Sequence, residues 1–236
     1  MRPRLLYVPI FAGFEADPLR EAMASWGEVE SFDGPGAGTR HAEDPGGPES
    51  MAAAGAARLD ELGWESCVLV SDSHAQAAAI ELALRDPRAA GIAISHASAR
   101  YGPGGERPAL NPAIYSAAAQ LLATDYRSFG RALTQLTHGA LDDTWVDRFI
   151  AEVPQATAEA RTAALPDGLE LATRLRHESI EILLAGHRGC MMWTPEAVED
   201  AAAALPHARL LWFDGVPLGE PGYHEAVREL CARVFG

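Results

Sequence analysis

The residues of this chain with the clearest spacing for chemistry surround Ser73. The segment Cys67-Val-Leu-Val-Ser-Asp-Ser-His-Ala leads from an apolar run typical of a buried strand directly into an amphipathic helical pattern. A sharp turn there needs small residues two before and two after its apex, and Ser71 and Ala75 meet that need. Such a turn would expose the Ser73 hydroxyl as a nucleophile, with the backbone N–H of His74 as an oxyanion donor. The alternative is an ordinary N-cap serine.

A serine nucleophile needs a base, and three histidines are candidates. His96 is the first, because it ends an apolar run at 90–95 that is expected to lie beside the strand of Ser73. Its alternative role is a hydrogen-bonded histidine in a strand-end loop. His74 follows Ser73 directly, so its side chain is expected to diverge. His187 comes just after a core strand and could point into the same cleft.

Several acidic residues near these positions are expected to have structural roles. Asp72 should face away from the nucleophile or into the rim of the site, and Asp33 ends a predicted strand near the edge of the sheet. Asp17 precedes Pro18, a spacing that predicts a helix N-cap.

Three other residues are candidates for lining a substrate pocket. Cys190 could place a thiol in the cleft, although a free cysteine is more often a small buried hydrophobe. Trp193 and Tyr126, with other aromatic residues, are expected to contribute apolar surface that suits a small, largely apolar organic or acyl substrate.

The elements that position these residues follow the pattern of an α/β protein. Short apolar runs predict strands, and longer amphipathic stretches between them predict the helices of a mostly parallel sheet. The predicted strands are 4–9, 28–32, 66–71, 90–95, 181–185 and 209–213. The predicted helices of this part are 17–26, 49–62, 74–84, 195–204 and 223–234.

The middle of the chain predicts a helical cap, or lid, inserted into that core. From residue 99 to about 176 the strand pattern is absent, and helices are predicted at 112–123, 125–136, 143–152 and 157–164. We therefore expect a core of residues 1–98 and 177–236 and a cap of residues 99–176 over a cleft.

Composition excludes several classes of function. The 236 residues carry a net charge of -14, which disfavours nucleic acid and anionic membrane surfaces as partners. All 19 basic residues are arginine, so a Schiff-base lysine, a pyridoxal phosphate anchor and a P-loop lysine are excluded. The three cysteines and eight histidines are dispersed, and we expect no metal and no cofactor.

The sequence also bears on the compartment. No apolar run approaches the ~20 residues of a membrane span, and the first residues lack the features of a secretion signal. We therefore expect a cytoplasmic protein with a small-molecule substrate. A homodimer is left open.

Motifs along nearly the whole chain resemble those of the α/β-hydrolase superfamily. The segment Glu28-Val-Glu-Ser-Phe-Asp-Gly-Pro-Gly-Ala-Gly resembles its strand and D-x-P-G-x-G turn, and Leu5-Leu-Tyr-Val-Pro-Ile-Phe-Ala-Gly-Phe resembles its preceding strand and oxyanion loop. The stretches Ile182-Leu-Leu-Ala-Gly-His-Arg-Gly-Cys and Pro206-His-Ala-Arg-Leu-Leu-Trp-Phe-Asp-Gly resemble its last core strands. The resemblance implies the α/β-hydrolase fold with Ser73 on the nucleophile turn. It also implies that Asp33 braces the turn after its strand, and a catalytic role is the alternative for this residue.

The chain departs from the family at the partners of that serine. The resemblance places the acid at Gly189 or Cys190 and the histidine in the turn Gly215-Val-Pro-Leu-Gly, and neither residue type is present. The His-Gly of the oxyanion loop is replaced by Pro9-Ile10, which leaves the N–H of Phe11, or of Ala12, as the expected donor.

Three functions are consistent with these residues. The first is ester or thioester hydrolysis through Ser73 with a relocated base, His96 first. The second is a non-hydrolytic enzyme, such as a lyase, cyclase or isomerase of specialised metabolite biosynthesis, that uses the triad-depleted pocket. The third is a non-catalytic binding protein.

Overall fold

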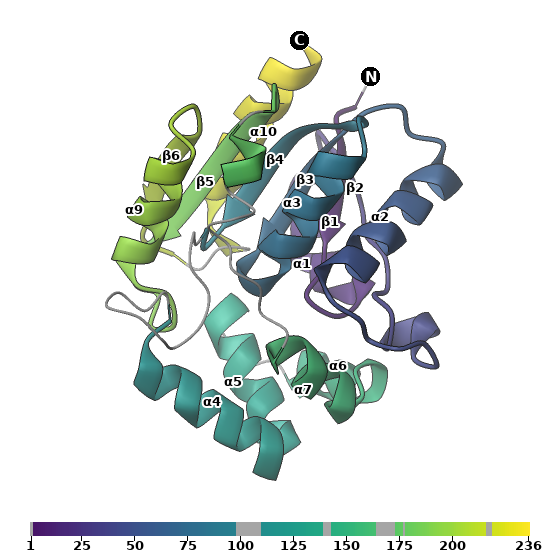
Figure 1. Cartoon of the computed structure of the whole chain (residues 1–236), viewed down its shortest axis with the longest axis vertical. Coiled ribbons are helices and arrows are strands. Elements are labelled where there is room, and N and C mark those ends of the chain that lie inside the picture. The colour runs from purple at the N-terminus through teal and green to yellow at the C-terminus, as the bar shows by residue number, and fades with distance from the viewer. Residues whose placement is uncertain (1, 98–109, 139–142, 164–172, 177, 216–218) are drawn as a thin grey trace.

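A parallel sheet of six strands forms the centre of the protein, in the order β2-β1-β3-β4-β5-β6 (Figure 1). The computed structural model describes residues 2–97, 110–138, 143–163, 173–176, 178–215 and 219–236. The strands are β1 (Arg4–Val8), β2 (Glu28–Glu30), β3 (Cys67–Asp72), β4 (Ala89–Ser95), β5 (Glu181–His187) and β6 (Arg209–Phe213). The predicted α/β class and all six predicted strands are confirmed.

Helices cover both faces of this sheet, because alternate residues of each buried strand point to opposite sides. In β1, Leu6 and Val8 pack with the helices α2 (Pro48–Leu62) and α3 (Gln76–Arg85). The helix α9 (Pro195–Ala204) contributes to the same layer.

On the opposite face the neighbouring residues of β1 make the second layer. Leu5 and Tyr7 pack with α1 (Asp17–Met23) and α10 (Pro221–Phe235). Three short 3-10 helices, η1 (Gly13–Ala16), η2 (Gly38–Arg40) and η3 (Ser73–Ala75), lie in the connections.

Four further helices gather at the end of the molecule toward which the strands run (Figure 1). They are α4 (Pro112–Thr124), α5 (Tyr126–His138), α6 (Asp143–Glu152) and α7 (Gln155–Ala163), close to their predicted positions. Their apolar side chains, including Phe129 and Phe149, pack against Phe11 and Phe14 of the core. The predicted limits of the cap, 98/99 and 176/177, fall on or next to residues outside the described part of the chain.

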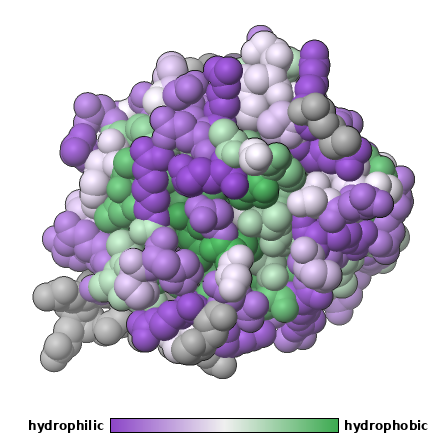
Figure 2. All heavy atoms as spheres, turned by 90° about the horizontal axis from the view of Figure 1, so that it is seen from above, coloured by the Kyte–Doolittle hydropathy of each residue, from purple (hydrophilic) through white to green (hydrophobic). Residues whose placement is uncertain are grey.

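The end of the molecule away from these helices is mostly polar, with an apolar band near its centre (Figure 2). Within the described residues, none of the helices has both the length and the apolar character needed to cross a bilayer.

Candidate active site

Ser73 lies at the apex of a sharp turn between β3 and α3. Its φ angle is +52°, in the left-handed region that non-glycine residues rarely adopt. The strand β3 is buried along its whole length, and the chain reverses at η3 so that α3 can pack back against the sheet. Strain of this kind occurs at functional sites, nucleophile turns among them, and His96 shares it, with a φ angle of +51°.

Two aromatic side chains contact the Ser73 hydroxyl. Oγ lies 3.2 Å from Nδ1 of His74 and accepts a hydrogen bond of 2.8 Å from Nε1 of Trp193. The rings of His74 and Trp193 pack edge to face at 5.4 Å. The expectation that the His74 side chain diverges from Ser73 is therefore wrong, because the left-handed turn brings adjacent side chains together.

The predicted base, His96, forms a buried ion pair with Asp72. Its Nδ1 lies 3.0 Å from Oδ1 of Asp72, and both side chains are at most 5% exposed. Asp72 takes neither expected placement, facing away or in the rim, because it is buried level with Ser95 at the end of the neighbouring strand and contacts His96. The other ring nitrogen of His96, Nε2, has no hydrogen-bond partner within the described ranges, so it is not bonded to the hydroxyl of Ser73.

The remaining polar residues of this edge surround His96. The ring of His187 lies 4.7 Å from the ring of His96, and its Nδ1 and Nε2 contact the carbonyl of Gly215 and the hydroxyl of Ser95. The thiol of Cys190 interacts with the His96 side chain and accepts a hydrogen bond from the backbone N–H of Trp193. Residues 216–218, in the turn where the resemblance implied a histidine, lie outside the described part.

Burial and charge separate the three histidines of the site. Burial lowers the pKa of His74 and of His187 to about 4. Burial also acts to lower the pKa of His96, but the Asp72 carboxylate and the Cys190 thiol outweigh it and raise that pKa to about 9. At neutral pH His96 is therefore a cation, whereas His74 and His187 are neutral.

These shifts predict that stability falls as the pH drops below 6.5 and falls less steeply above it, where the lowered pKa of Cys190 partly offsets the contribution of His96. The raised pKa of His96 stabilises the fold below 6.5, and this contribution is lost as the pH rises through about 9. The lowered pKa values of His74 and His187 stabilise it above 6.5, and this contribution is lost as the pH falls through about 4. The pKa of Glu15 is raised to about 7, so its contribution lowers the stability as the pH rises from about 4.5 to 7. This loss is smaller than the gain in stability from the two histidines over the same pH range.

Urea unfolding at half-unit steps from pH 5 to 9 measures this profile. In His96→Asn the fall in the free energy of unfolding above pH 6.5 should become shallower, while the acid side keeps its slope. An alkaline limb unchanged by this substitution would contradict the assignment.

The loop after β1 is occupied by a carboxylate. Glu15 accepts hydrogen bonds from the backbone N–H groups of Ile10, Phe11 and Ala12 at 2.8, 2.7 and 3.0 Å. The expected oxyanion donor, the N–H of Phe11, is therefore already used. Burial raises the pKa of Glu15 to about 7, against the opposing effect of these hydrogen bonds and of Arg161.

An apolar pocket opens beside this edge of the sheet, between core and cap. Of the predicted site residues, His74 and Phe11 line it, whereas Tyr126 packs inside the cap and donates a hydrogen bond from its hydroxyl to the carbonyl of Val153. The lining is mostly aliphatic and aromatic: Pro9, Ile10, Phe11, Gly46, Gly47, Pro48, Met51, His74, Ala75, Ala78, Tyr115, Ala118, Ala119, Phe129, Leu133, Arg161, Thr162 and Met192.

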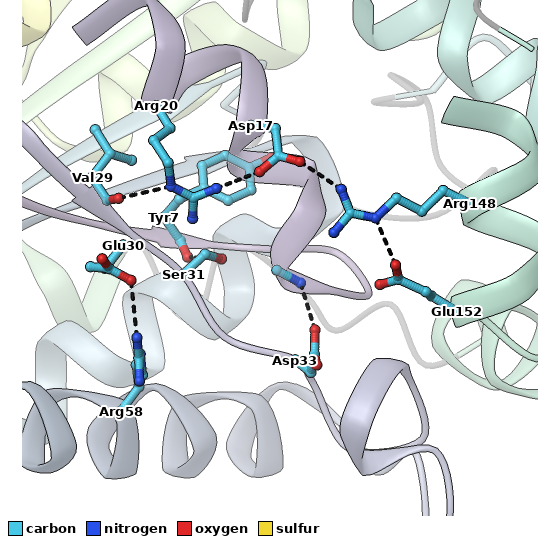
Figure 3. A network of polar contacts seen from close by, with 11 residues as sticks. Tyr7, Asp17, Arg20, Val29, Glu30, Ser31, Asp33, Arg58, Arg148 and Glu152 are labelled. Atoms are coloured by element: carbon cyan, nitrogen blue, oxygen red, sulfur yellow. Dashed lines mark hydrogen bonds and ion pairs between the residues drawn. The ribbon is translucent and has the colours of Figure 1, made fainter. Parts of the chain in front are cut away.

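Two arginines of the cap attach it to the core. Arg161 on α7 reaches the loop after β1, where its guanidinium donates to the backbone carbonyls of Ile10 and Phe11, and it also contacts the carbonyl of Pro35. Arg148 on α6 pairs with Asp17 at 2.7 Å, at a surface where both side chains are about half exposed (Figure 3).

Figure 3 also shows the roles of two predicted structural acids. Asp33 accepts a hydrogen bond from the N–H of Gly13, and further bonds from Thr39, so its predicted bracing role is confirmed. Burial alone would raise the pKa of Asp33, but these hydrogen bonds lower it below its usual range. Asp17 is the first residue of α1 rather than its N-cap, and it pairs with Arg20 and Arg148.

Removing Arg161 should destabilise the protein far more than removing Arg148. Arg161→Gln leaves buried carbonyls without their charged donor, and we expect a loss of about 2–3 kcal/mol in the free energy of unfolding. Arg148→Gln breaks exposed pairs and should cost less than about 1 kcal/mol. Urea unfolding of both variants provides the comparison, and equal losses would contradict the role of Arg161 as the main attachment.

Several residues of the site were predicted from the sequence, but most of the contacts between them were not. Parallel pairing of β3 with β4 places Asp72 level with the residue before His96, which the adjacency of the two predicted strands could have indicated. Glu15 lies three residues after Ala12, the N-cap of η1. A glutamate at this spacing often accepts a hydrogen bond from the N-cap backbone, so this contact could have been predicted. No local pattern marks Arg161, because its partners are far away in the sequence.

No group of three or more His, Cys, Asp or Glu side chains within the described ranges is arranged to hold a metal ion.

Comparison with known proteins finds similarity in structure alone. No family model matches the chain, and no curated protein matches it. Among solved structures, the enol-lactonase from Burkholderia xenovorans LB400 is similar with a TM-score of 0.77 and 16% identity, over 98% of this chain and 92% of that one. A bromoperoxidase from Bacillus anthracis has a TM-score of 0.76 and 15% identity, over 98% and 92% of the two chains. An esterase from a Rhodococcus species has a TM-score of 0.76 and 16% identity, over 99% and 91%.

Proposed function

We propose that this chain, which has the α/β-hydrolase fold, is an enzyme that hydrolyses esters or thioesters of small, largely apolar acyl groups through Ser73. The observation that carries the proposal is the strained turn at Ser73, where φ is +52° and the hydroxyl lies 3.2 Å from a neutral imidazole. The names of two similar structures, an enol-lactonase and an esterase, support the same reaction type.

The geometry favours His74 over His96 as the base. A His74 tautomer without a proton on Nδ1 accepts the hydrogen of the Ser73 hydroxyl as the oxygen attacks the acyl carbon. Burial and the charge of His96 act to lower the pKa of His74, and the nearby Asp72 carboxylate, which acts to raise it, is the group that stabilises the imidazolium that results. The indole N–H of Trp193, 2.8 Å from Oγ, stabilises negative charge on that oxygen.

The oxyanion of this reaction has two expected donors. One is the backbone N–H of His74, directly after the nucleophile. The other is the N–H of Phe11, which becomes available when the Glu15 carboxylate leaves it. The proposed reaction therefore includes exchange of one anion for another at the loop after β1.

Labelling with a fluorophosphonate tests the proposal. The probe should add one phosphonyl group to wild-type protein, mapped to Ser73 by peptide mass spectrometry, and none to Ser73→Ala. Cys190→Ala is the matched control and should label normally. The absence of an adduct between pH 6 and 9, or an adduct that survives in Ser73→Ala, would overturn the proposal.

The pocket predicts a preference for extended apolar acyl groups. Ala118 on α4 lines it, whereas its neighbour Ala117 is exposed and points elsewhere. Ala118→Phe should raise KM for a decanoyl ester by about 10-fold, because aromatic bulk replaces the space for several methylene groups, and should leave an acetyl ester within about twofold. Ala117→Phe serves as the control, and equal effects of both variants on the long ester would contradict the assignment of this pocket.

One observation favours a second candidate, a non-hydrolytic lyase, cyclase or isomerase. Glu15 fills the loop that would hold an oxyanion, and its pKa of about 7 suits proton transfer in a dry site. In that case Ser73→Ala would keep turnover on the true substrate, whereas Glu15→Gln would abolish it. The hydrolytic proposal predicts the reverse order of severity.

A further inference from the structure

A second group of reactive side chains lies on the same edge of the sheet, and only one of its members, Asp72, also contributes to the Ser73 reaction. Asp72 ends β3, His96 follows β4, and Cys190 follows β5, so three adjacent parallel strands supply one residue each. Because parallel strands end at one edge of the sheet, these side chains converge although 118 positions separate Asp72 from Cys190 in the sequence.

The order of contacts within this group is that of a thiol triad. The Nδ1 of His96 is held by Asp72 at 3.0 Å, which fixes the orientation of the ring. The opposite nitrogen, Nε2, is buried and has no hydrogen-bond partner among the described residues. The Cys190 thiol interacts with the His96 side chain, and the ring also packs 4.7 Å from the ring of His187. An acid that orients an imidazole beside a nucleophile is the arrangement that activates such groups.

The surroundings of Cys190 support a negatively charged sulfur. The sulfur accepts a hydrogen bond of 3.3 Å from the N–H of Trp193 and interacts with the backbone of Met192. Cys190 is partly exposed, whereas Cys67 and Cys231 are fully buried among apolar side chains. Met192, two residues further along, lines the apolar pocket.

Other titratable groups also face this cluster. The neutral rings of His187 and His74 lie beside it, and the hydroxyls of Tyr7 and Tyr223 lie near Asp72 on the α1 and α10 side. Burial raises the pKa of both tyrosines, so neither adds charge at neutral pH. Glu220 lies near His187.

We propose that Cys190, with His96 and Asp72, forms a second nucleophilic centre that accepts an acyl group from a thioester or an activated ester. The Cys190 thiolate attacks the acyl carbon, and a carbon–sulfur bond forms. The bond to the leaving group breaks as His96 gives its proton to the leaving sulfur or oxygen. Water then attacks the acyl-cysteine and gives a proton to His96, which releases the carboxylic acid and restores the thiolate. This inference does not depend on Ser73.

Alkylation by iodoacetamide tests the thiol. Peptide mass spectrometry follows the rate at Cys190 against pH, with Cys67 and Cys231 as unreactive controls within the same chain. The rate at Cys190 should follow an apparent pKa below the 8.5 that is typical of a free thiol. In His96→Asn that value should rise to about 8.5 or higher, and the rate at pH 6.5 should fall about 10-fold. His41→Asn, at an exposed position, should change neither.

An apparent pKa of 8.5 or higher in wild-type protein, or an unchanged profile in His96→Asn, would overturn the proposal. If His96→Asn does not fold, NMR titration of His96 in Cys190→Ala decides the question. Loss of the thiolate should lower the titration midpoint of His96, and an unchanged midpoint would overturn the pairing.

The acyl step is tested in Ser73→Ala, so that Ser73 cannot contribute. Incubation with a decanoyl N-acetylcysteamine thioester should increase the intact mass by one acyl group, mapped to Cys190 and absent in Ser73→Ala/Cys190→Ala. A thiol that alkylates rapidly yet never acylates would overturn the assignment as acyl acceptor. Fluorophosphonate labelling of Ser73 is a separate measurement, so failure of one proposal is distinguishable from failure of the other.

Discussion

Replacing Ser73 with alanine in a Cys190→Ala background, which lacks the second nucleophile proposed above, is expected to lower kcat/KM for a p-nitrophenyl decanoate by at least about 10³-fold, because the attacking oxygen is lost while the pocket remains. KM should change little, since the acyl chain is held by apolar side chains and not by the hydroxyl. Stopped-flow or steady-state release of p-nitrophenol measures the effect.

The same strand offers a matched control for this substitution. Ser71 is also a buried serine of β3, and its hydroxyl has no hydrogen-bond partner in the part of the chain that the structure describes. Ser71→Ala removes the same atom two residues earlier and should leave kcat/KM within about twofold and stability nearly unchanged. Equal activity of the two variants would show that the hydroxyl at the turn is not the nucleophile.

Replacing Asp72 with asparagine is expected to lower the free energy of unfolding at pH 7 by about 3–5 kcal/mol. The substitution removes one partner of a buried ion pair and leaves the His96 cation without its carboxylate partner. The raised pKa of His96 should fall at the same time, which an NMR titration of its ring can follow. Urea unfolding gives the stability difference.

An exposed ion pair provides the control for Asp72→Asn. Asp214 pairs with Arg188 at 3.0 Å, but its side chain is 86% exposed. Asp214→Asn should therefore cost less than about 1 kcal/mol. In the double variant Asp72→Asn/His96→Asn, the loss should be smaller than the sum of the single losses, because the uncompensated charge is gone. Additive losses would contradict a direct pair.

The fold could be predicted from the sequence because its signals are local. Strands such as β6 and helices such as α6 and α9 begin and end where the hydrophobic pattern changes. The turn at Ser73 could also be predicted, since small residues on both sides of a serine between strand and helix are visible in the sequence.

The contacts of the candidate site could not be predicted in the same way. That His96 pairs with Asp72 and interacts with Cys190 depends on which strand ends lie level, and sequence pattern does not determine register across crossovers. The orientation of the His74 side chain depends on the left-handed backbone of Ser73, and this conformation cannot be predicted from the residue type. The hydrogen bond from the backbone N–H of Phe11 to the Glu15 carboxylate forms because that side chain folds back onto its own loop.

The strands β3, β4 and β5 are paired in register at this edge of the sheet, and this bears on how catalytic residues can change position during evolution. Because Asp72 pairs in register with Ser95, and Ser95 with Ala185, residues just beyond these positions occupy neighbouring places in space. Point substitutions there can transfer an attacking atom or a proton acceptor from one strand to the next without any rearrangement of the backbone. Catalytic groups on this architecture can thus migrate between lineages while the sheet beneath them stays the same.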